Sequence, residues 1–149
     1  MNIETFTLCE KSEIINNELV ITKPLKFLAT PKVPLIVTCD LAIKVSFSDS
    51  EILKPQKLIY TIFAPDGKPY HNQILKENMR VPKNFLYSAN ITFSVNQFGS
   101  HLVLALIGTG KSEYKIVVLP IPADSGTPKD AIYAGWMYMQ HVFIVHISE

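Results

Sequence analysis

The sequence lacks the features that would direct a chain into or across a membrane. It has no uninterrupted apolar run of about 18 residues, which is the minimum for a spanning helix. The nearest candidate is IYAGWMYMQHVFIVHI, residues 132–147, and Gln140, His141 and His146 interrupt it. The first residues, MNIETFTLCEKSE, do not combine a basic segment with an apolar core, as a signal peptide would. We therefore predict a cytoplasmic protein without a transmembrane segment.

Cysteine is scarce, with only Cys9 and Cys39 among 149 residues. Two thiols in a chain of this length are not a disulfide framework, and in the cytoplasm we expect both to stay reduced. Neither belongs to a Cys-x-x-Cys motif or has a histidine close to it in the sequence. The pattern therefore indicates no thiol nucleophile.

The sequence also lacks a recognisable metal-binding or catalytic motif. The acidic residues are scattered rather than grouped as calcium loops require, and the histidines have no metal-ligand spacing. We expect the histidines, His71, His101, His141 and His146, at the surface or at strand edges. A zinc site or a hydrolase site assembled from histidines of different strands is an alternative. The main prediction is that the chain has no catalytic, cofactor-binding or metal-binding residues, is not an enzyme and needs no cofactor.

Charge is low and balanced. Charged residues make up 18% of the chain, and 14 basic and 13 acidic residues leave a formal net charge of +1. Proteins that bind nucleic acids normally carry a strongly positive surface, so we predict no nucleic-acid partner. The hydrophobic content of 48% and the length of 149 residues instead indicate one globular domain with a sizeable core.

No segment has a convincing helical period, and the dominant pattern has period two. Residues 35–47 place aliphatic side chains and Cys39 on one face and polar side chains on the other. Residues 85–97 alternate in the same way, with Leu86 as the one exception. This alternation is typical of strands with one buried and one wet face. We therefore expect Cys39 to be a small core residue.

Shorter strands are predicted between turn signals. Residues 3–9 and 18–22 are expected to pair as a hairpin around Asn16-Asn17, because asparagine tolerates the left-handed conformation. A strand at 57–63 ends at the turn sequence Ala64-Pro65-Asp66-Gly67, and 70–81 is expected to be a further strand. About seven to nine strands at this spacing predict an all-β fold, a single antiparallel β-sandwich of immunoglobulin-like type.

Residues 105–112, ALIGTGKS, match the loose P-loop pattern of Ala or Gly, four residues and Gly-Lys-Ser. A phosphate-binding loop needs a strand that ends before the motif and a helix that begins at the Lys-Ser. Here the apolar run LVLALI continues into the motif, and the β-branched segment EYKIVVLPIP follows it. We predict instead a hairpin in which 101–107 pairs with 113–121, and no nucleotide bound at Gly110-Lys111-Ser112.

The C-terminal part differs in composition from the rest. We place the sandwich at residues 3–122 and a linker with an apolar tail at 123–149, where Trp, Met and Tyr are concentrated. The tail is expected to form an added edge strand, a short helix on the sandwich or an exposed apolar end. Its candidate contact residues are Tyr133, Trp136, Tyr138 and Phe143.

Several short motifs follow one another along the chain: Leu8-Cys9-Glu10, Asn17 to Ile21, Phe27 to Pro34, Asp66 to Pro69, Phe98 to His101 and Leu119 to Ile121. In this order they resemble a bacterial family of small, leaderless β-sandwich domains of unknown function. The resemblance covers residues 3–122 and implies an immunoglobulin-like sandwich, without implying any catalytic residue. The family pattern usually has an aromatic residue where this chain has His101.

Two functions follow as hypotheses. The first is a non-catalytic interaction or accessory module that binds an unknown protein partner or associates with itself. The alternative is a small-ligand or carbohydrate binder with a pocket at one end of the sandwich. Its lining residues would be Tyr70, His71, Tyr114 and Trp136.

Overall fold

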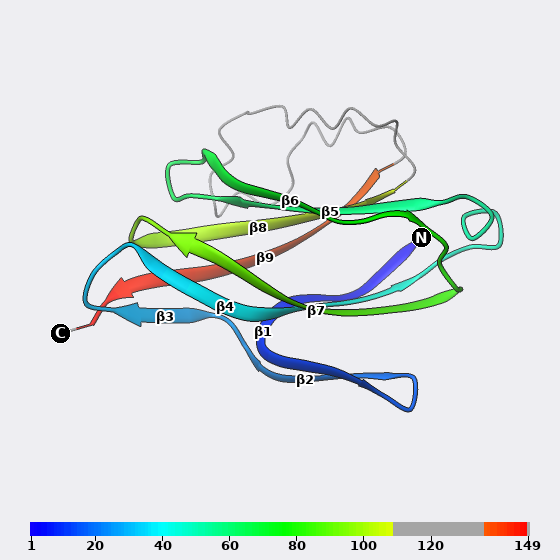
Figure 1. Ribbon diagram of the computed structural model, residues 1–149, viewed down its shortest axis with the longest axis horizontal. Coiled ribbons are helices and arrows are strands. Elements are labelled where there is room, and N and C mark those ends of the chain that lie inside the picture. Colours follow the sequence, from blue (N-terminus) through cyan, green and yellow to red (C-terminus); the bar gives the residue numbers. More distant parts are fainter. Residues whose placement is uncertain (109–135, 149) are drawn as a thin grey trace.

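The computed structural model describes residues 1–108 and 136–148, and its elements are all β-strands (Figure 1). Among these residues no helix is long and apolar enough to span a membrane. The strands are β1 (Asn2–Ile15), β2 (Glu18–Pro24), β3 (Phe27–Thr30), β4 (Leu35–Ser46), β5 (Gln56–Phe63), β6 (Pro69–Met79), β7 (Asn84–Val95), β8 (Gly99–Gly108) and β9 (Trp136–Ile147).

The strands form two sheets that lie one over the other (Figure 1). The first sheet has the order β2-β1-β4-β7, and the second has the order β3-β9-β8-β5-β6. The prediction of an all-β fold is therefore confirmed. The prediction of a purely antiparallel arrangement is wrong, because β3 and β9 pair in parallel from Phe27↔Ile144 to Thr30↔Ile147. Nearly the whole domain lies between these strands, which is ample length for a parallel crossover.

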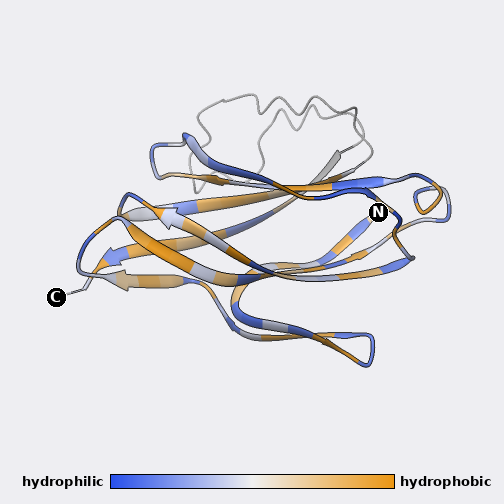
Figure 2. Cartoon of the chain, in the orientation of Figure 1, coloured by the Kyte–Doolittle hydropathy of each residue, from blue (hydrophilic) through white to orange (hydrophobic). Residues whose placement is uncertain are grey.

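The two longest period-two segments lie side by side at the centre of this arrangement. β4 and β7 pair without interruption from Leu35↔Val95 to Ser46↔Asn84, so their apolar faces turn to the same side. That side meets the second sheet in a shared core, in which Cys39 is only 3% exposed. The predicted strands and the predicted core position of Cys39 are confirmed. Figure 2 shows the hydrophobic residues along strands of both layers.

The first hairpin forms, although its pairing differs from the expected one. β1 is 14 residues long, and its second half, Cys9–Ile15, pairs with β2 around Asn16 and Asn17, whose φ angles are 52° and 61°. The first half, from Asn2 to Cys9, pairs with β4 instead. The asparagine turn is confirmed, and the pairing of 3–9 with 18–22 is wrong because β1 continues past Cys9 to reach β2.

The C-terminal strand β9 is an interior strand. It pairs with β8 on one side and with β3 on the other, so it is neither an added edge strand nor a short helix. The sequence was expected to divide into a sandwich of residues 3–122 and a tail of residues 123–149, with β9 in the tail. The observed pairing of β9 with β3 and β8 instead makes it a strand of the second sheet. The boundary itself lies outside the described residues.

The predicted hairpin of 101–107 with 113–121 is also wrong in its pairing. A strand has two edges, and from Leu102 to Gly108 those of β8 are taken by β5 on one side and β9 on the other. Ala105 to Gly108, the first half of the ALIGTGKS motif, lie in this fully paired strand. Residues 109–112, and with them Gly110-Lys111-Ser112, lie outside the described residues.

Candidate functional site

Of the four contact residues predicted on the tail, only Phe143 has a described side chain. Phe143 is fully buried, with its ring centroid 5.0 Å from that of His101 and 5.9 Å from that of Phe93. It is therefore a core residue, since β9 lies inside the sheet and turns Phe143 toward the other layer. Tyr133 lies outside the described residues. Trp136 and Tyr138 belong to β9, but their side chains are not described.

The expected pocket of four aromatic residues does not form. Tyr70 and His71 are adjacent, and in a regular strand they would face opposite sides. A register shift between the pairs Ile62↔His71 and Phe63↔Pro69 interrupts the alternation at Tyr70, so both side chains turn into the space between the sheets. Trp136 pairs with Gly108, at the far end of β8 and about 20 Å along the strand from the row of Phe63. Tyr114 lies outside the described residues. This version of the pocket is wrong.

A groove opens where β1 leaves β4. β4 pairs with β7 along its whole length, but with β1 only from Asp40 to Ser46. Along Leu35–Cys39 the edge of β4 that faces away from β7 has no strand beside it in the described part of the chain. In a strand, alternate residues direct their backbone N–H and C=O groups to each side, so this edge offers unpaired hydrogen-bonding groups.

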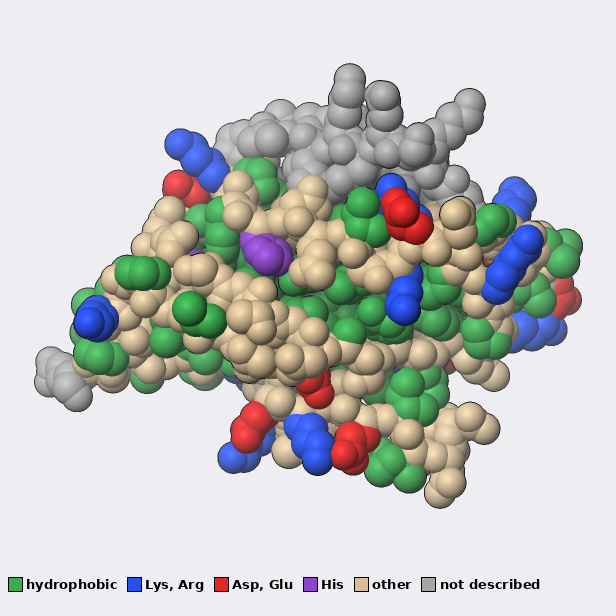
Figure 3. All heavy atoms as spheres, viewed as in Figure 1, with side chains coloured by type: hydrophobic (Ala, Val, Ile, Leu, Met, Phe, Trp, Pro, Cys, Tyr) green, Lys and Arg blue, Asp and Glu red, His purple; other side chains and the backbone are tan. Residues whose placement is uncertain are grey.

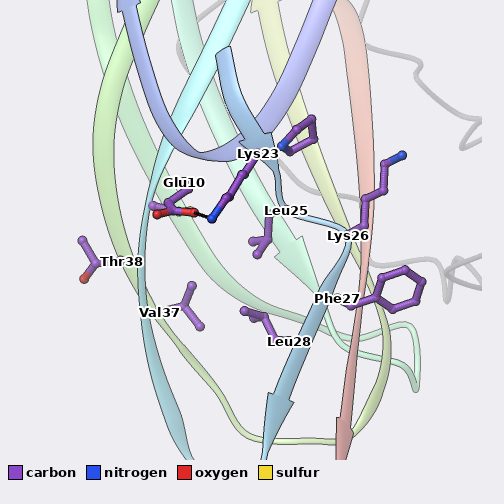
Figure 4. A pocket seen from close by; sticks show the side chains of 10 residues that line it. Glu10, Lys23, Leu25, Lys26, Phe27, Leu28, Val37 and Thr38 are labelled. Carbon is purple, nitrogen blue, oxygen red and sulfur yellow. Dashed lines mark ion pairs between the residues drawn. The ribbon is translucent and has the colours of Figure 1, made fainter.

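The groove beside this edge has a volume of about 570 Å³. Its other wall is the segment that leads from β2 in one sheet to β3 in the other. Figure 4 shows Leu25, Leu28 and Val37 pointing toward one another across it, while an ion pair of 3.6 Å between Lys23 and Glu10 crosses one end. The groove is therefore apolar in its middle and polar at its rim. Nothing in the sequence pattern pointed to it.

A second, smaller cavity of about 250 Å³ lies at one end of the two layers. The turn between β5 and β6 forms one wall, and its conformation is the predicted one. Gly67 N–H donates to the carbonyl of Ala64 over 2.8 Å, and Gly67 has a positive φ of 84°. The start of β8 and the residues after β7 form the other walls, with His101 and Tyr70 at the inner end.

Three of the four histidines are buried or half-buried rather than at the surface, although His71 lies on β6, an edge strand of its sheet, as the expectation allowed. His71 Nε2 lies 2.9 Å from the hydroxyl of Tyr60, and His141 Nε2 donates to the carbonyl of Leu25 over 2.6 Å. Burial lowers the pKa of His71, His101 and His141, so these rings favour the neutral form. No group of three or more metal-ligating side chains occurs among residues 1–108 and 136–148.

The surface carries charges of both signs. Figure 3 shows basic and acidic side chains scattered over one face of the molecule without a continuous patch of either sign. Several of these side chains form exposed ion pairs, such as Lys44 with Glu4 at 3.1 Å and Lys83 with Asp49 at 2.7 Å. Exposed pairs of this kind contribute little to stability or to binding.

The chain matches no family model, no curated protein and no solved structure. The groove and the end cavity are therefore interpreted from their own geometry.

Proposed function

We propose that the protein is a non-catalytic interaction module that binds an extended segment of a partner protein in the groove beside β4. The observation that carries this proposal is the open edge of Leu35–Cys39 next to an apolar groove of about 570 Å³. The partner segment would form an added strand beside Leu35–Cys39, on the side of β4 that β1 occupies from Asp40 to Ser46. Its backbone would supply the missing hydrogen bonds, as in recognition by strand addition.

The groove defines the chemistry of the partner segment. A strand turns alternate side chains to opposite faces. Side chains that face the groove would meet Leu25, Leu28 and Val37, and should therefore be apolar. Those on the opposite face would lie near Thr38 and Ile36, both exposed, and can be polar. The preferred partner is thus an uncharged or weakly charged segment with alternating apolar residues.

Two other edge strands of the described chain, β6 and β3, are less suited to this role. β6 contains Lys76 and Glu77 and has several register shifts along β5, while β3 is only four residues long. Charges, irregular register and short length all oppose the addition of a strand. The edge of β7 is long and uncharged, so it is a competing surface that the experiment must separate from the groove.

A matched pair of variants separates these two edges. Thr38 and Thr92 are both exposed and share a hydrogen bond of 3.1 Å between their hydroxyls. Thr38→Lys and Thr92→Lys each remove this bond and add a lysine to the outer face of the same sheet. Only Thr38 lines the groove, whereas Thr92 lies on the edge strand β7.

The test starts from random peptides displayed against the whole protein, followed by an NMR titration with a selected peptide. We expect enriched peptides with alternating apolar residues and amide shifts along Leu35–Cys39. Thr38→Lys should weaken binding by about tenfold, close to 1.4 kcal/mol, and Thr92→Lys should leave it unchanged. Enrichment of no peptide, or loss of binding only in Thr92→Lys, would show that the groove is not the binding site.

We also propose that the two layers have an immunoglobulin-like architecture. The orders β1-β4-β7 and β9-β8-β5-β6 correspond to strands A-B-E and G-F-C-C′ of a variable-type domain. In this correspondence Cys39 takes the place of the cysteine on strand B. Cys9 and Cys39 are both free and buried, so the disulfide between the two sheets of antibody domains is absent here.

The remaining proposals concern the setting of the protein. We propose that it works in the cytoplasm, where its two buried thiols stay reduced. We propose further that it belongs to the bacterial family of β-sandwich domains that its motifs resemble, and that it binds neither nucleic acid nor nucleotide. The balanced charge supports the absence of a nucleic-acid partner. Full pairing of Ala105 to Gly108 in β8 leaves the first half of the P-loop motif without free amides for phosphate.

A further inference from the structure

The groove exists because β1 leaves β4, and the register of the two strands shows what continued pairing would require. From Thr5↔Lys44 to Cys9↔Asp40 the strands pair without a shift, and the pairing then stops. The edge of Leu35–Cys39 consequently has no strand beside it in the described part of the chain. Extending the same register would pair Glu10 with Cys39, Lys11 with Thr38, Ser12 with Val37, Glu13 with Ile36 and Ile14 with Leu35.

Two residues of β1 would be misplaced in this continued register. Residues directly opposite each other in an antiparallel pair turn to the same face of the sheet. Cys39 and Val37 face the core, so Glu10 and Ser12 would be carried into it. Burying a carboxylate without a cation beside it is strongly unfavourable, and burying an unpaired hydroxyl is less so. Glu10 is therefore the residue that most opposes the continuation of β1 along β4.

The other pairs of the continued register are acceptable. On the outer face, Lys11 and Glu13 would stand opposite exposed side chains of β4. On the inner face, Ile14 would join Leu35, which packs against the core. Apart from the two misplaced residues, the sequence of β1 is thus compatible with closure of the groove.

The observed path of the hairpin keeps both polar side chains out of the core. Glu10 is exposed and forms its ion pair with Lys23 at the end of the groove (Figure 4). Lys23 has a φ of 50°, so β2 departs from the extended conformation at the level of this pair. The backbone N–H of Ser12 donates to the carboxylate of Asp40 over 2.6 Å, and the Ser12 hydroxyl lies 2.6 Å from that of Ser88. Ser12 thus lies over the outer face of the sheet instead of beside the edge of β4.

We propose that Glu10 keeps the groove free by excluding β1 from the open edge of β4. Its carboxylate opposes pairing within the chain, so the edge stays available to a segment from elsewhere. The exclusion of β1 does not depend on what the groove binds, whereas its consequence for a partner rests on the proposed function. By the same argument, the groove should reject a partner segment that carries a carboxylate opposite Cys39.

A pair of double variants tests this role. Glu10→Val/Ser12→Val makes both misplaced residues apolar. Glu13→Val/Ser12→Val is the matched control, because it also removes one carboxylate and its exposed ion pair, which Glu13 forms with Lys11 at 2.8 Å. Position 13 would lie on the outer face in the continued register, so the control should leave β1 where it is. Lys23→Gln removes the ion pair of Glu10 but keeps the carboxylate, and it should also leave the groove open.

The state of the edge is followed by amide hydrogen exchange in the full chain without a partner. In the parent, the amides of Leu35–Cys39 that face the open edge should exchange rapidly. In Glu10→Val/Ser12→Val they should exchange about tenfold more slowly, with new NOEs between residues 11 and 38. Glu10→Val alone changes only an exposed side chain and should slow the same amides. Parent-like exchange in both of these variants, or equal slowing in the control, would overturn the role of Glu10.

Binding of the selected peptide separates this inference from the proposed function. If the groove is the binding site, Glu10→Val/Ser12→Val should weaken peptide binding about tenfold, and the control should bind as the parent does. Slower exchange together with unchanged peptide affinity would support the role of Glu10 and would overturn the groove as the peptide site. The two proposals can therefore fail independently.

Discussion

Replacing Phe143 by alanine tests the position of β9 in the core. The side chain is fully buried and its ring packs against the rings of His101 and Phe93. Truncating a buried phenylalanine costs about 3–5 kcal/mol, from lost burial and from the cavity that remains. We therefore expect Phe143→Ala to lower the free energy of unfolding by about 4 kcal/mol. For a domain of this size this corresponds to a Tm lower by about 8–16 °C.

The next residue supplies the control. Ile144 lies on the opposite face of β9 and is 38% exposed. Ile144→Ala should cost no more than about 1 kcal/mol, because little surface is lost from the core. Both variants are compared with the parent by urea unfolding, followed by tryptophan fluorescence and by far-ultraviolet circular dichroism.

The reasoning is refuted if the two substitutions cost the same, or if Phe143→Ala costs less than about 1 kcal/mol. Either result would mean that β9 does not turn Phe143 toward the other sheet. Phe143 would then return as a candidate surface contact, as its place in an apolar tail had suggested.

Three further predictions concern the whole domain. Deleting residues 136–149 removes the interior strand β9. The shortened chain should lose its cooperative unfolding transition and its dispersed NMR spectrum. A folded product would show that β9 is dispensable. Burial raises the pKa of the Cys39 thiol to about 12 and that of the Cys9 thiol above its usual range. Neither thiol should therefore react with a thiol reagent at pH 8 until denaturant is added. Rapid labelling of the native protein would contradict this prediction. Burial lowers the pKa of His101, so below about pH 6.5 the unfolded chain takes up a proton at this residue that the folded protein does not. The free energy of unfolding should therefore fall as the pH drops below this value. His101 contributes at most about 1.4 kcal/mol per pH unit to this fall. His101→Phe should flatten this dependence in urea unfolding measured between pH 7 and 5, and an unchanged slope would show that His101 does not resist protonation.

The candidate sites were predictable only in part. Tyr70 was expected to line a pocket at one end of the fold, and it does line the end cavity. His101 was noted only for departing from an aromatic position. A signal was available in the sequence, since His101 shares its face of β8 with Val103, Ala105 and Ile107, and is thus a polar residue on an inward face. The groove beside β4 had no such signal, because it exists only where β1 diverges from β4.

The local conformation of the chain could be predicted from short stretches of its sequence. The alternation in 35–47 and 85–97 and the turn at Ala64 to Gly67 depend on side chains and φ preferences within a few residues, and the structure has them as predicted. The choice of neighbouring strands, by contrast, depends on long-range packing. Segments 113–121 and 136–147 are both apolar and rich in strand-forming residues, so either sequence pattern is compatible with a strand beside β8, on the edge that does not face β5. β9 occupies that edge because there Phe143 and Val145 join the shared core, a long-range gain in burial that no local pattern encodes.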